Sequence, residues 1–272
     1  MRLWNGWGNE DSDLTMELSS GLSMLLEALV GTGTALPQAT LNDVISKVPN
    51  TRLENHPLII TDPETRVRHS RGQSLPDWLE MHSGNVDTFP DGVAFPESSE
   101  QVRELLAHAK ENNLVVIPYG GGTSVVGHIN PENTDKPILT IDMGKMNSMM
   151  SIDTESQLAT FGAGAPGPIV EEELKKQGYT LGHFPQSWEL STLGGWVASR
   201  SSGQQSLHYG RIENMFAGGS IETFNGTMTI PTIPASSAGP DVREMILGSE
   251  GRIGIITEVT VRITPLPEEE KF

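Results

Sequence analysis

Three consecutive glycines, Gly120, Gly121 and Gly122, lie between a short apolar run and two hydroxyl residues in "LVVIPYGGGTSVVGH", residues 114–128. Glycine adopts positive φ at little cost, and successive backbone N–H groups in such a loop can point into one concavity that binds an anion. Thr123 and Ser124 add hydroxyl donors. No Gly-Lys-Ser/Thr ending follows, so the loop is not of the Walker type. The stretch indicates either a plain turn or a phosphate-binding loop.

A second glycine motif is "GAGAPG", residues 162–167, which satisfies G-x-G-x-x-G between a predicted strand and a predicted helix. That context is the one a nicotinamide dinucleotide site requires. The unit has no clear parallel partner strands, however, and "FPQSWE" stands where an acidic strand end would be expected. A nicotinamide site is therefore the weaker alternative.

Two further blocks are rich in small residues. In "GHFPQSWELSTLGGWVASRSSG", residues 182–203, Ser191 and Thr192 precede two glycines at a predicted helix start, where N–H groups can bind an anion. The plain alternative is a capped helix whose glycines allow close packing. In "GSEGRIGIITE", residues 248–258, a glycine-rich turn leads into a strand, and the alternative is a simple connection.

Nucleophile and metal chemistry find little support. The chain has no cysteine, so disulfides, thiolate zinc sites and cysteine nucleophiles are excluded. The seven histidines form no HExxH-like pair and no metal site is expected. His128 and His183 each adjoin a glycine and are candidates for catalysis, although a structural role is the commoner one for a lone histidine.

The formal net charge of −17 argues against a nucleic-acid partner, because phosphate backbones need clustered Lys and Arg. No run approaches about 18 consecutive apolar residues, so no membrane span is expected. The polar, acidic beginning of the chain does not resemble a signal peptide, and we expect a cytoplasmic protein.

Hydrophobic spacing predicts a mixture of helices and strands without a regular βαβ repeat, which favours an α+β fold. Helices are expected over 13–30 (from Leu14 onward), 40–47, the residues after a Ser98/Gln101 capping box, 168–177, the block around 191–203, and a short stretch opened by Pro240 and Asp241. Strands are expected at 114–118, 137–142, 156–164 and 252–265, with a hairpin at Asn225-Gly226. Residues 50–95 are expected to wrap around a core built by the rest.

Taken in order, "IPYGGGTSVVGH", "PQSWELSTLGGWVASRSSG", "YGRIENM" and "GPDVREMILGSEGRIGIITEVTVRI" resemble the FAD-binding, PCMH-type domain of the vanillyl-alcohol oxidase and p-cresol methylhydroxylase family. "WNGWG" near the amino terminus makes the sequence most similar to the branch of alkyldihydroxyacetonephosphate synthases and bacterial FAD-linked oxidases. The resemblance covers nearly the whole chain.

The resemblance implies an α+β fold of two subdomains that clasp FAD. We expect a mainly helical N-terminal extension at 1–86 and an FAD-binding domain at 87–267, with subdomains at 87–150 and 151–267. Residues 268–272 would begin the connection to a substrate-binding cap domain, which is expected to be absent from this chain.

By the same resemblance, three groups of residues would hold FAD. The diphosphate would lie on Pro118, Tyr119, Gly120, Gly121, Gly122, Thr123 and Ser124. Other parts would be lined by Gln186, Ser187, Trp188, Glu189, Leu190, Ser191, Thr192, Ser199, Arg200, Ser201 and Ser202, and the last strand would contribute Glu250, Gly251, Arg252, Ile253, Gly254, Ile255 and Ile256. His183 is the candidate catalytic group near the flavin.

Two positions depart from the family pattern. Thr123 stands where some members carry the histidine that attaches FAD covalently, and no cysteine is available for a second linkage, so noncovalent FAD is expected. Gln186 stands where the synthase has an aspartate.

The implied activity is exchange of an acyl for an alkyl chain on a lipid-like glycerone phosphate, without net redox change. Two alternatives stay open: an FAD-dependent dehydrogenase or oxidase of a 2-hydroxy acid or alcohol, and a non-catalytic FAD-binding fragment. An apolar face left bare by the missing cap would favour a homo-oligomer or a separate cap partner.

Overall fold

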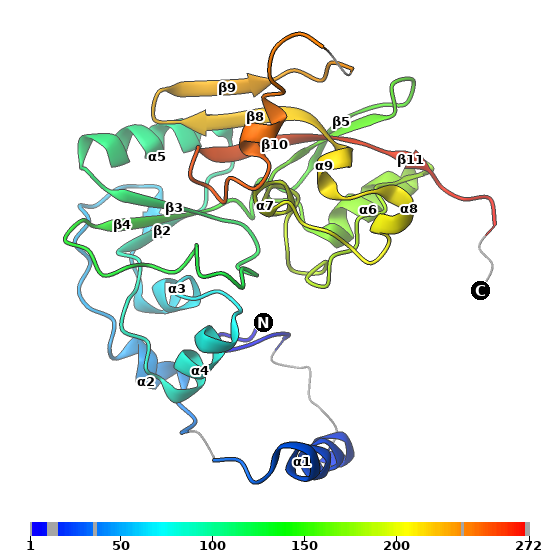
Figure 1. Cartoon of the computed structure of the whole chain (residues 1–272). Helices are drawn as coiled ribbons and strands as arrows, with labels where there is room; N and C mark the ends of the chain where they lie inside the picture. Colours follow the sequence, from blue (N-terminus) through cyan, green and yellow to red (C-terminus); the bar gives the residue numbers. More distant parts are fainter. Residues whose placement is uncertain (1, 10–15, 35–36, 235–236, 270–272) are drawn as a thin grey trace.

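The computed structural model describes residues 2–9, 16–34, 37–234 and 237–269, with side chains in the first helix from residue 20 onward. Figure 1 shows the two larger β-sheets with helices around them, and a helical N-terminal region beneath the first sheet. This arrangement confirms the predicted α+β fold with a mainly helical N-terminal extension.

The first sheet has the strand order β1-β2-β4-β3. Its strands are β1 (Ile59–Ile60), β2 (Gly92–Ala94), β3 (Val115–Tyr119) and β4 (Ile138–Asp142). Strands β2, β4 and β3 are parallel, and β1 is antiparallel to β2. All three residues of β2 are buried, so the prediction that residues 50–95 only wrap around the core is wrong there. The boundary at 86/87 stays a prediction.

The second sheet is antiparallel, in the order β5-β6-β10-β8-β9. Its strands are β5 (Met149–Asp153), β6 (Leu158–Gly162), β8 (Phe216–Thr223), β9 (Gly226–Ile230) and β10 (Ile255–Arg262). The predicted β8–β9 hairpin is confirmed. Because Thr223 pairs with Gly226, its turn consists of Phe224 and Asn225, one residue earlier than the predicted dipeptide.

Helix α5 (Ser99–Glu111) connects β2 to β3 and lies between the two sheets in Figure 1. It buries Val102, Leu105, Leu106 and Ala109. The Ser98 side chain caps it by accepting from the Gln101 N–H. The Gln101 side chain accepts from the Glu97 N–H instead of that of Ser98, so only half of the predicted capping box forms.

The helices from α6 to α10 pack around the second sheet or join its strands. They are α6 (Gly167–Lys176), α7 (Leu193–Ser199), α8 (Ser206–Tyr209), α9 (Ile212–Met215) and α10 (Arg243–Ile246). Phe161, Val170, Trp196 and Val259 belong to the large apolar core between α6, α7 and the sheet. The short strands β7 (Tyr179–Thr180) and β11 (Thr264–Pro265) pair antiparallel beside it.

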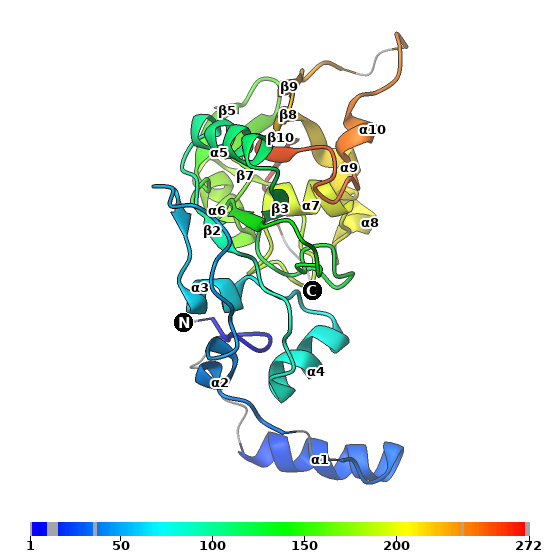
Figure 2. The same cartoon turned by 90° about the vertical axis from the view of Figure 1, so that its left-hand side faces the viewer.

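The N-terminal region contains α1 (Met16–Val30), α2 (Leu41–Ile45), α3 (Pro63–Arg68) and α4 (Leu75–Ser83). The last three helices share a small core that includes Val44, Val67 and Met81. Helix α1 stands apart from the rest in Figures 1 and 2, and its side chains from residue 20 to residue 30 are exposed. The predicted helix over 13–30 is confirmed from residue 16, while Leu14 lies outside the described residues. Within the described part of the chain, no helix has the length and apolar character to cross a membrane.

The "GAGAPG" motif lies where the two sheets meet, and its glycines serve close packing. A Cβ on Gly162 would lie 2.2 Å from the Met146 carbonyl oxygen, and one on Gly164 would lie 1.8 Å from that of Met143. The nicotinamide interpretation is wrong for this motif, because β6 is antiparallel to both of its neighbours and forms no βαβ unit.

Replacing Gly164 by Ala should therefore destabilise the junction of the sheets. The added methyl group would overlap the Met143 carbonyl, and overpacking of this kind costs about 1–3 kcal/mol or more. Gly21→Ala is the matched control, because open space surrounds Gly21 in α1. Urea unfolding should show a lower midpoint for Gly164→Ala and no loss for the control. An unchanged midpoint for Gly164→Ala would contradict this account of the motif.

Candidate functional site

A cavity of about 340 Å³ lies between the two sheets, within the size range of small-molecule sites. Its walls come from the glycine loop after β3, the approach to α7, the end of α7 and the turn into β10. Of the predicted site residues, those that line it are Pro118, Tyr119, Gly120, Gly121, Gly122, Thr123, Ser124, Ser187, Ser191, Thr192, Ser199, Ser201, Glu250, Gly251, Gly254, Ile255 and Ile256.

The other predicted residues lie elsewhere. Arg252 and Ile253 line a neighbouring cavity of about 440 Å³, which shares Pro118, His128 and Glu250 with the first. The residues that line neither are Gln186, Trp188, Glu189, Leu190, Arg200, Ser202 and His183. Sequence reasoning missed several wall residues, among them Val125, Val126 and Trp196. The two valines directly follow the glycine loop in the sequence, and that adjacency could have singled them out.

The glycine loop is pressed against the segment before α7. A Cβ on Gly120 would lie 2.4 Å from Thr192 Oγ1, and one on Gly121 would lie 1.8 Å from the Leu190 carbonyl oxygen. Gly122 has φ of 66°, and its Cβ would lie 2.0 Å from the Tyr119 hydroxyl. A side chain is therefore excluded at each of the three positions because it would clash with neighbouring atoms. At Gly122 the positive φ also disfavours any residue other than glycine.

The backbone N–H groups of residues 120–125 donate to no acceptor within the described part of the chain. Unpaired backbone donors beside a cavity are a costly arrangement unless water or a ligand receives them. Several N–H groups in one loop can together hold an anion.

The start of α7, in contrast, has no free donors for an anion. Leu193 N–H donates to the Ala165 carbonyl at 2.9 Å and Gly194 N–H to that of Ala163 at 2.8 Å. Gly195 N–H donates to Thr192 Oγ1 at 3.3 Å. The capped, closely packed helix is thus the correct reading of these residues, and the anion-binding interpretation of this helix start is wrong.

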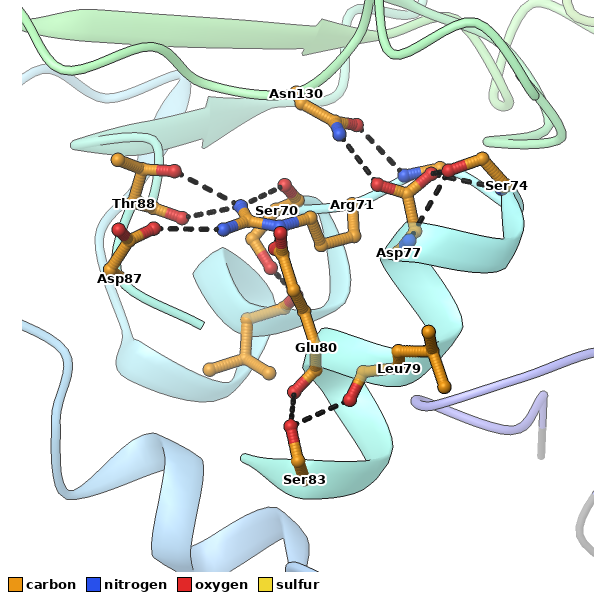
Figure 3. Close-up of polar contacts among 12 residues, drawn as sticks. Ser70, Arg71, Ser74, Asp77, Leu79, Glu80, Ser83, Asp87, Thr88 and Asn130 are labelled. Carbon is orange, nitrogen blue, oxygen red and sulfur yellow. Dashed lines mark hydrogen bonds and ion pairs between the residues drawn. The ribbon is translucent and has the colours of Figure 1, made fainter. Parts of the chain in front are cut away.

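The far end of the glycine loop is anchored to the N-terminal region. Gln73 N–H donates to the Ser124 carbonyl at 2.6 Å. Figure 3 shows Asn130 between Asp77 and the backbone before α4: its Nδ2 donates to Asp77 Oδ1 at 2.6 Å, and its Oδ1 accepts from Gly72 N–H at 3.0 Å. Asp77 also forms the capping box of α4 with the N-cap residue Ser74, from whose N–H it accepts a hydrogen bond. This hydrogen-bond network, which includes the buried Asp77 carboxylate, therefore fixes the end of the glycine loop against the N-terminal region.

His183 lies behind the cavity wall and is 1% exposed. Its Nε2 contacts Ser201 Oγ at 2.7 Å, its ring packs edge-on against Trp196, and its Nδ1 has no partner in the described structure. Burial lowers the pKa of His183 to about 4, so the imidazole is neutral near pH 7. It can position Ser201, which does line the cavity.

His128 lines both cavities at their junction. Its Nδ1 lies 3.2 Å from Ser124 Oγ and 3.8 Å from Glu250 Oε2. Burial lowers the pKa of His128, while the Glu250 carboxylate opposes that shift. Burial raises the pKa of Tyr119 to about 12, so its phenol is un-ionised. His128 is the one titratable cation-forming side chain among the described lining residues of the first cavity.

The chemistry of the wall suits a phosphate-bearing ligand with an apolar part. Backbone donors and the hydroxyl groups of Thr123 and Ser124 belong to the wall, and Val125, Trp196 and Ile255 supply apolar surface. The described wall contains no Lys or Arg, so backbone dipoles must receive an anion there. No cluster of three potential metal-ligating side chains occurs among the described residues.

Comparison with known proteins agrees with this geometry. Residues 90–230 match the model of the family described as "FAD binding domain". The chain is 40% identical over 211 residues to alkyldihydroxyacetonephosphate synthase of Dictyostelium discoideum, a match covering 78% of this chain and 34% of that protein. A solved structure of an alkyldihydroxyacetonephosphate synthase superposes with a TM-score of 0.87 at 31% identity, covering 98% of this chain and 55% of the other.

More distant matches include D-lactate dehydrogenase [cytochrome] 1 of Saccharomyces cerevisiae, 31% identical over 71% of this chain and 33% of that protein. The matched regions thus amount to about a third of these two curated relatives and about half of the solved structure.

The buried His183 should make stability depend on pH. Its pKa is about 4 in the folded chain and near 6.5 when unfolded, so between these values the unfolded chain binds more protons at this residue. The free energy of unfolding should fall by about 3 kcal/mol from this source as pH drops from 6.5 to 4. Urea unfolding of wild type and His183→Gln across that range should show a shallower decline for the variant. If the free energies of unfolding of the two proteins changed in parallel with pH, the low pKa of His183 would be contradicted.

Proposed function

Because the chain belongs to the family of FAD-binding domains, we propose that it is the FAD-binding part of a flavoenzyme of the alkyldihydroxyacetonephosphate synthase type. The main support is the loop at 120–124, where three positions exclude any side chain and the N–H groups beside the cavity have no acceptor in the described structure. A diphosphate bound by backbone donors tolerates a net charge of −17 better than one that requires a basic surface.

In this proposal different residues of the cavity wall bind different parts of FAD. The N–H groups from Gly120 to Ser124 and the hydroxyls of Thr123 and Ser124 hold the diphosphate. Other parts of FAD lie against the predicted residues of the α7 segment and of the turn into β10 that line the cavity: Ser187, Ser191, Thr192, Ser199, Ser201, Glu250, Gly251, Gly254, Ile255 and Ile256. The cofactor is held noncovalently, since Thr123 occupies the position at which a histidine would attach it.

Bound FAD would supply the reactive ring, and the protein would orient it and shield it from water. Trp196, Ile255 and Ile256 supply apolar wall for that purpose. The neutral His183 would keep Ser201 in place, and His128 is positioned to exchange a proton with a ligand beside Ser124. We extend the proposal to a small, lipid-like glycerone phosphate as substrate and to the cytoplasm as location.

A second candidate is a flavin dehydrogenase of a 2-hydroxy acid, favoured by the match to a D-lactate dehydrogenase. The two functions differ in whether substrate reduces the flavin. Anaerobic addition of D-lactate or glycolate to the FAD complex would bleach the flavin absorbance if the second candidate holds, and would leave it unchanged if the first does.

The primary test is titration of the purified chain with FAD. We expect a yellow complex and a rise in melting temperature that grows with FAD concentration, as for any ligand that binds only the folded state. NADH, tested in the same way, should not raise the melting temperature. A colourless protein with no FAD-dependent rise would overturn the proposed function.

Gly121→Ala should weaken FAD binding about tenfold or more, which corresponds to about 1.4 kcal/mol. The added Cβ would overlap the Leu190 carbonyl and displace the loop whose N–H groups are to hold the diphosphate. Gly33→Ala is the control, since it has no neighbour within 4 Å. FAD affinity should be measured by flavin fluorescence on variants whose circular dichroism matches wild type. Wild-type affinity in Gly121→Ala would argue against the loop as the binding element.

A further inference from the structure

Residues 2–9 form a small hairpin that is docked on the N-terminal helices. Leu3 N–H donates to the Gly8 carbonyl at 3.0 Å, and Arg2 and Asn9 form an antiparallel bridge. Trp4 packs against the apolar core that α2, α3 and α4 share. Gly6 is buried, and a Cβ there would meet the ring of His82 in α4 at 3.8 Å. The hairpin therefore has a defined place beside the first sheet.

From this hairpin Arg2 reaches the glycine loop. Its Nη1 donates to the Gly121 carbonyl at 2.5 Å, a contact between residues 119 positions apart. The Arg2 carbonyl in turn accepts from Arg68 Nη1 at 3.0 Å, and Arg68 is paired with Glu64 at 2.9 Å within α3. Both the backbone and the side chain of Arg2 are thus held in position.

The bond to Gly121 determines which way the next N–H group faces. In a trans peptide the C=O and the N–H lie on opposite sides, so the N–H of Gly122 points away from Arg2. Gly122 lines the cavity and Arg2 does not, and no described acceptor receives that N–H. Bonding of a carbonyl to a guanidinium is charge-assisted and polarises the peptide, which strengthens the donor on its other side.

The positive charge of Arg2 also favours the binding of an anion at the glycine loop. The described wall of the first cavity has no Lys or Arg, and the protein as a whole carries −17. Arg2 thus brings a full positive charge to the loop that is to receive an anion. A charge this close is felt across the loop, and salt screens it only partly when it is half-buried.

We propose that Arg2 is a positioning residue for the phosphate-binding loop: it orients the Gly121–Gly122 peptide toward the cavity and supplies the local positive charge that favours the FAD diphosphate. This inference rests on the proposed function, because it takes FAD as the ligand. It assigns to the hairpin at 2–9 a role in cofactor affinity in addition to its packing.

The test measures the FAD dissociation constant of the full chain, carrying its purification tag at the carboxyl end, at low and high KCl. Arg2→Ala should weaken FAD binding about tenfold at low salt and show a smaller dependence on KCl than wild type. Arg2→Lys, which keeps the charge and a donor, should restore affinity to within about threefold, whereas Arg2→Gln should not. Lys176→Ala, which removes an equal charge from an exposed side chain at the end of α6, should bind FAD like wild type.

The outcomes separate this inference from the proposed function. A wild-type chain that binds no FAD would overturn both. A wild-type chain that binds FAD while Arg2→Ala binds it equally well would overturn the role of Arg2 alone. So would an equal loss in Arg2→Lys and Arg2→Ala, or a loss in Lys176→Ala as large as that in Arg2→Ala. Melting temperatures without FAD identify any variant whose fold is damaged.

Discussion

The close approach of two backbone segments, the glycine loop after β3 and residues 190–192 before α7, is the constraint on which the cavity depends. The Leu190 carbonyl occupies the space that a side chain at Gly121 would need, and Thr192 meets Gly120 while it also caps α7. One contact therefore fixes the end of the parallel sheet, the start of a helix and the distance between the two sheets. Side chains at these glycines would force the segments apart and widen the cavity.

Buried charges hold the rest of the structure around this contact. Asp91 is buried directly before β2, and although burial opposes its ionisation, bonds from Arg52 and from the Ile138 N–H outweigh this and lower its pKa. Glu222 of β8 is buried and pairs with Arg103 of α5 at 2.9 Å. Removing one partner of such a pair leaves an uncompensated charge, so each pair ties its two elements to a single arrangement.

Much of the fold could be predicted because its longer elements carry clear periodic patterns. The apolar face of α5 and the β-branched run of β10 are legible in the sequence, and both elements form within the expected ranges. The two-residue strands β1 and β7 and the short helix α3 are too brief to show a period, and all three were missed. Contacts with residues distant in the sequence stabilise these three elements, and the local sequence pattern gives no sign of such contacts.

The site was partly predictable for a related reason. The glycines after β3 signal their role through composition, and all of them line the cavity. His183 looked like a site residue because it lies within a motif, yet the fold turns it behind Trp196. Which of the motif residues face inward depends on tertiary packing, so Ser201 lines the cavity while Ser202, its neighbour, does not. The approach of Arg2 could not be predicted, because it joins positions 119 apart.

The central place of β10 also has a consequence for the order in which the protein is made. This strand lies between β6 and β8, and the turn before it forms one wall of the cavity. During translation, residues 158–162 can pair with β5 at once but must wait for about a hundred later residues before their second partner strand, β10, exists, and closing so long a loop is slow. The glycine loop is synthesised well before its opposite wall. Cofactor capture therefore has to follow emergence of β10 from the ribosome, and until then the nascent chain presents an unfinished sheet edge that needs protection from misplaced pairing.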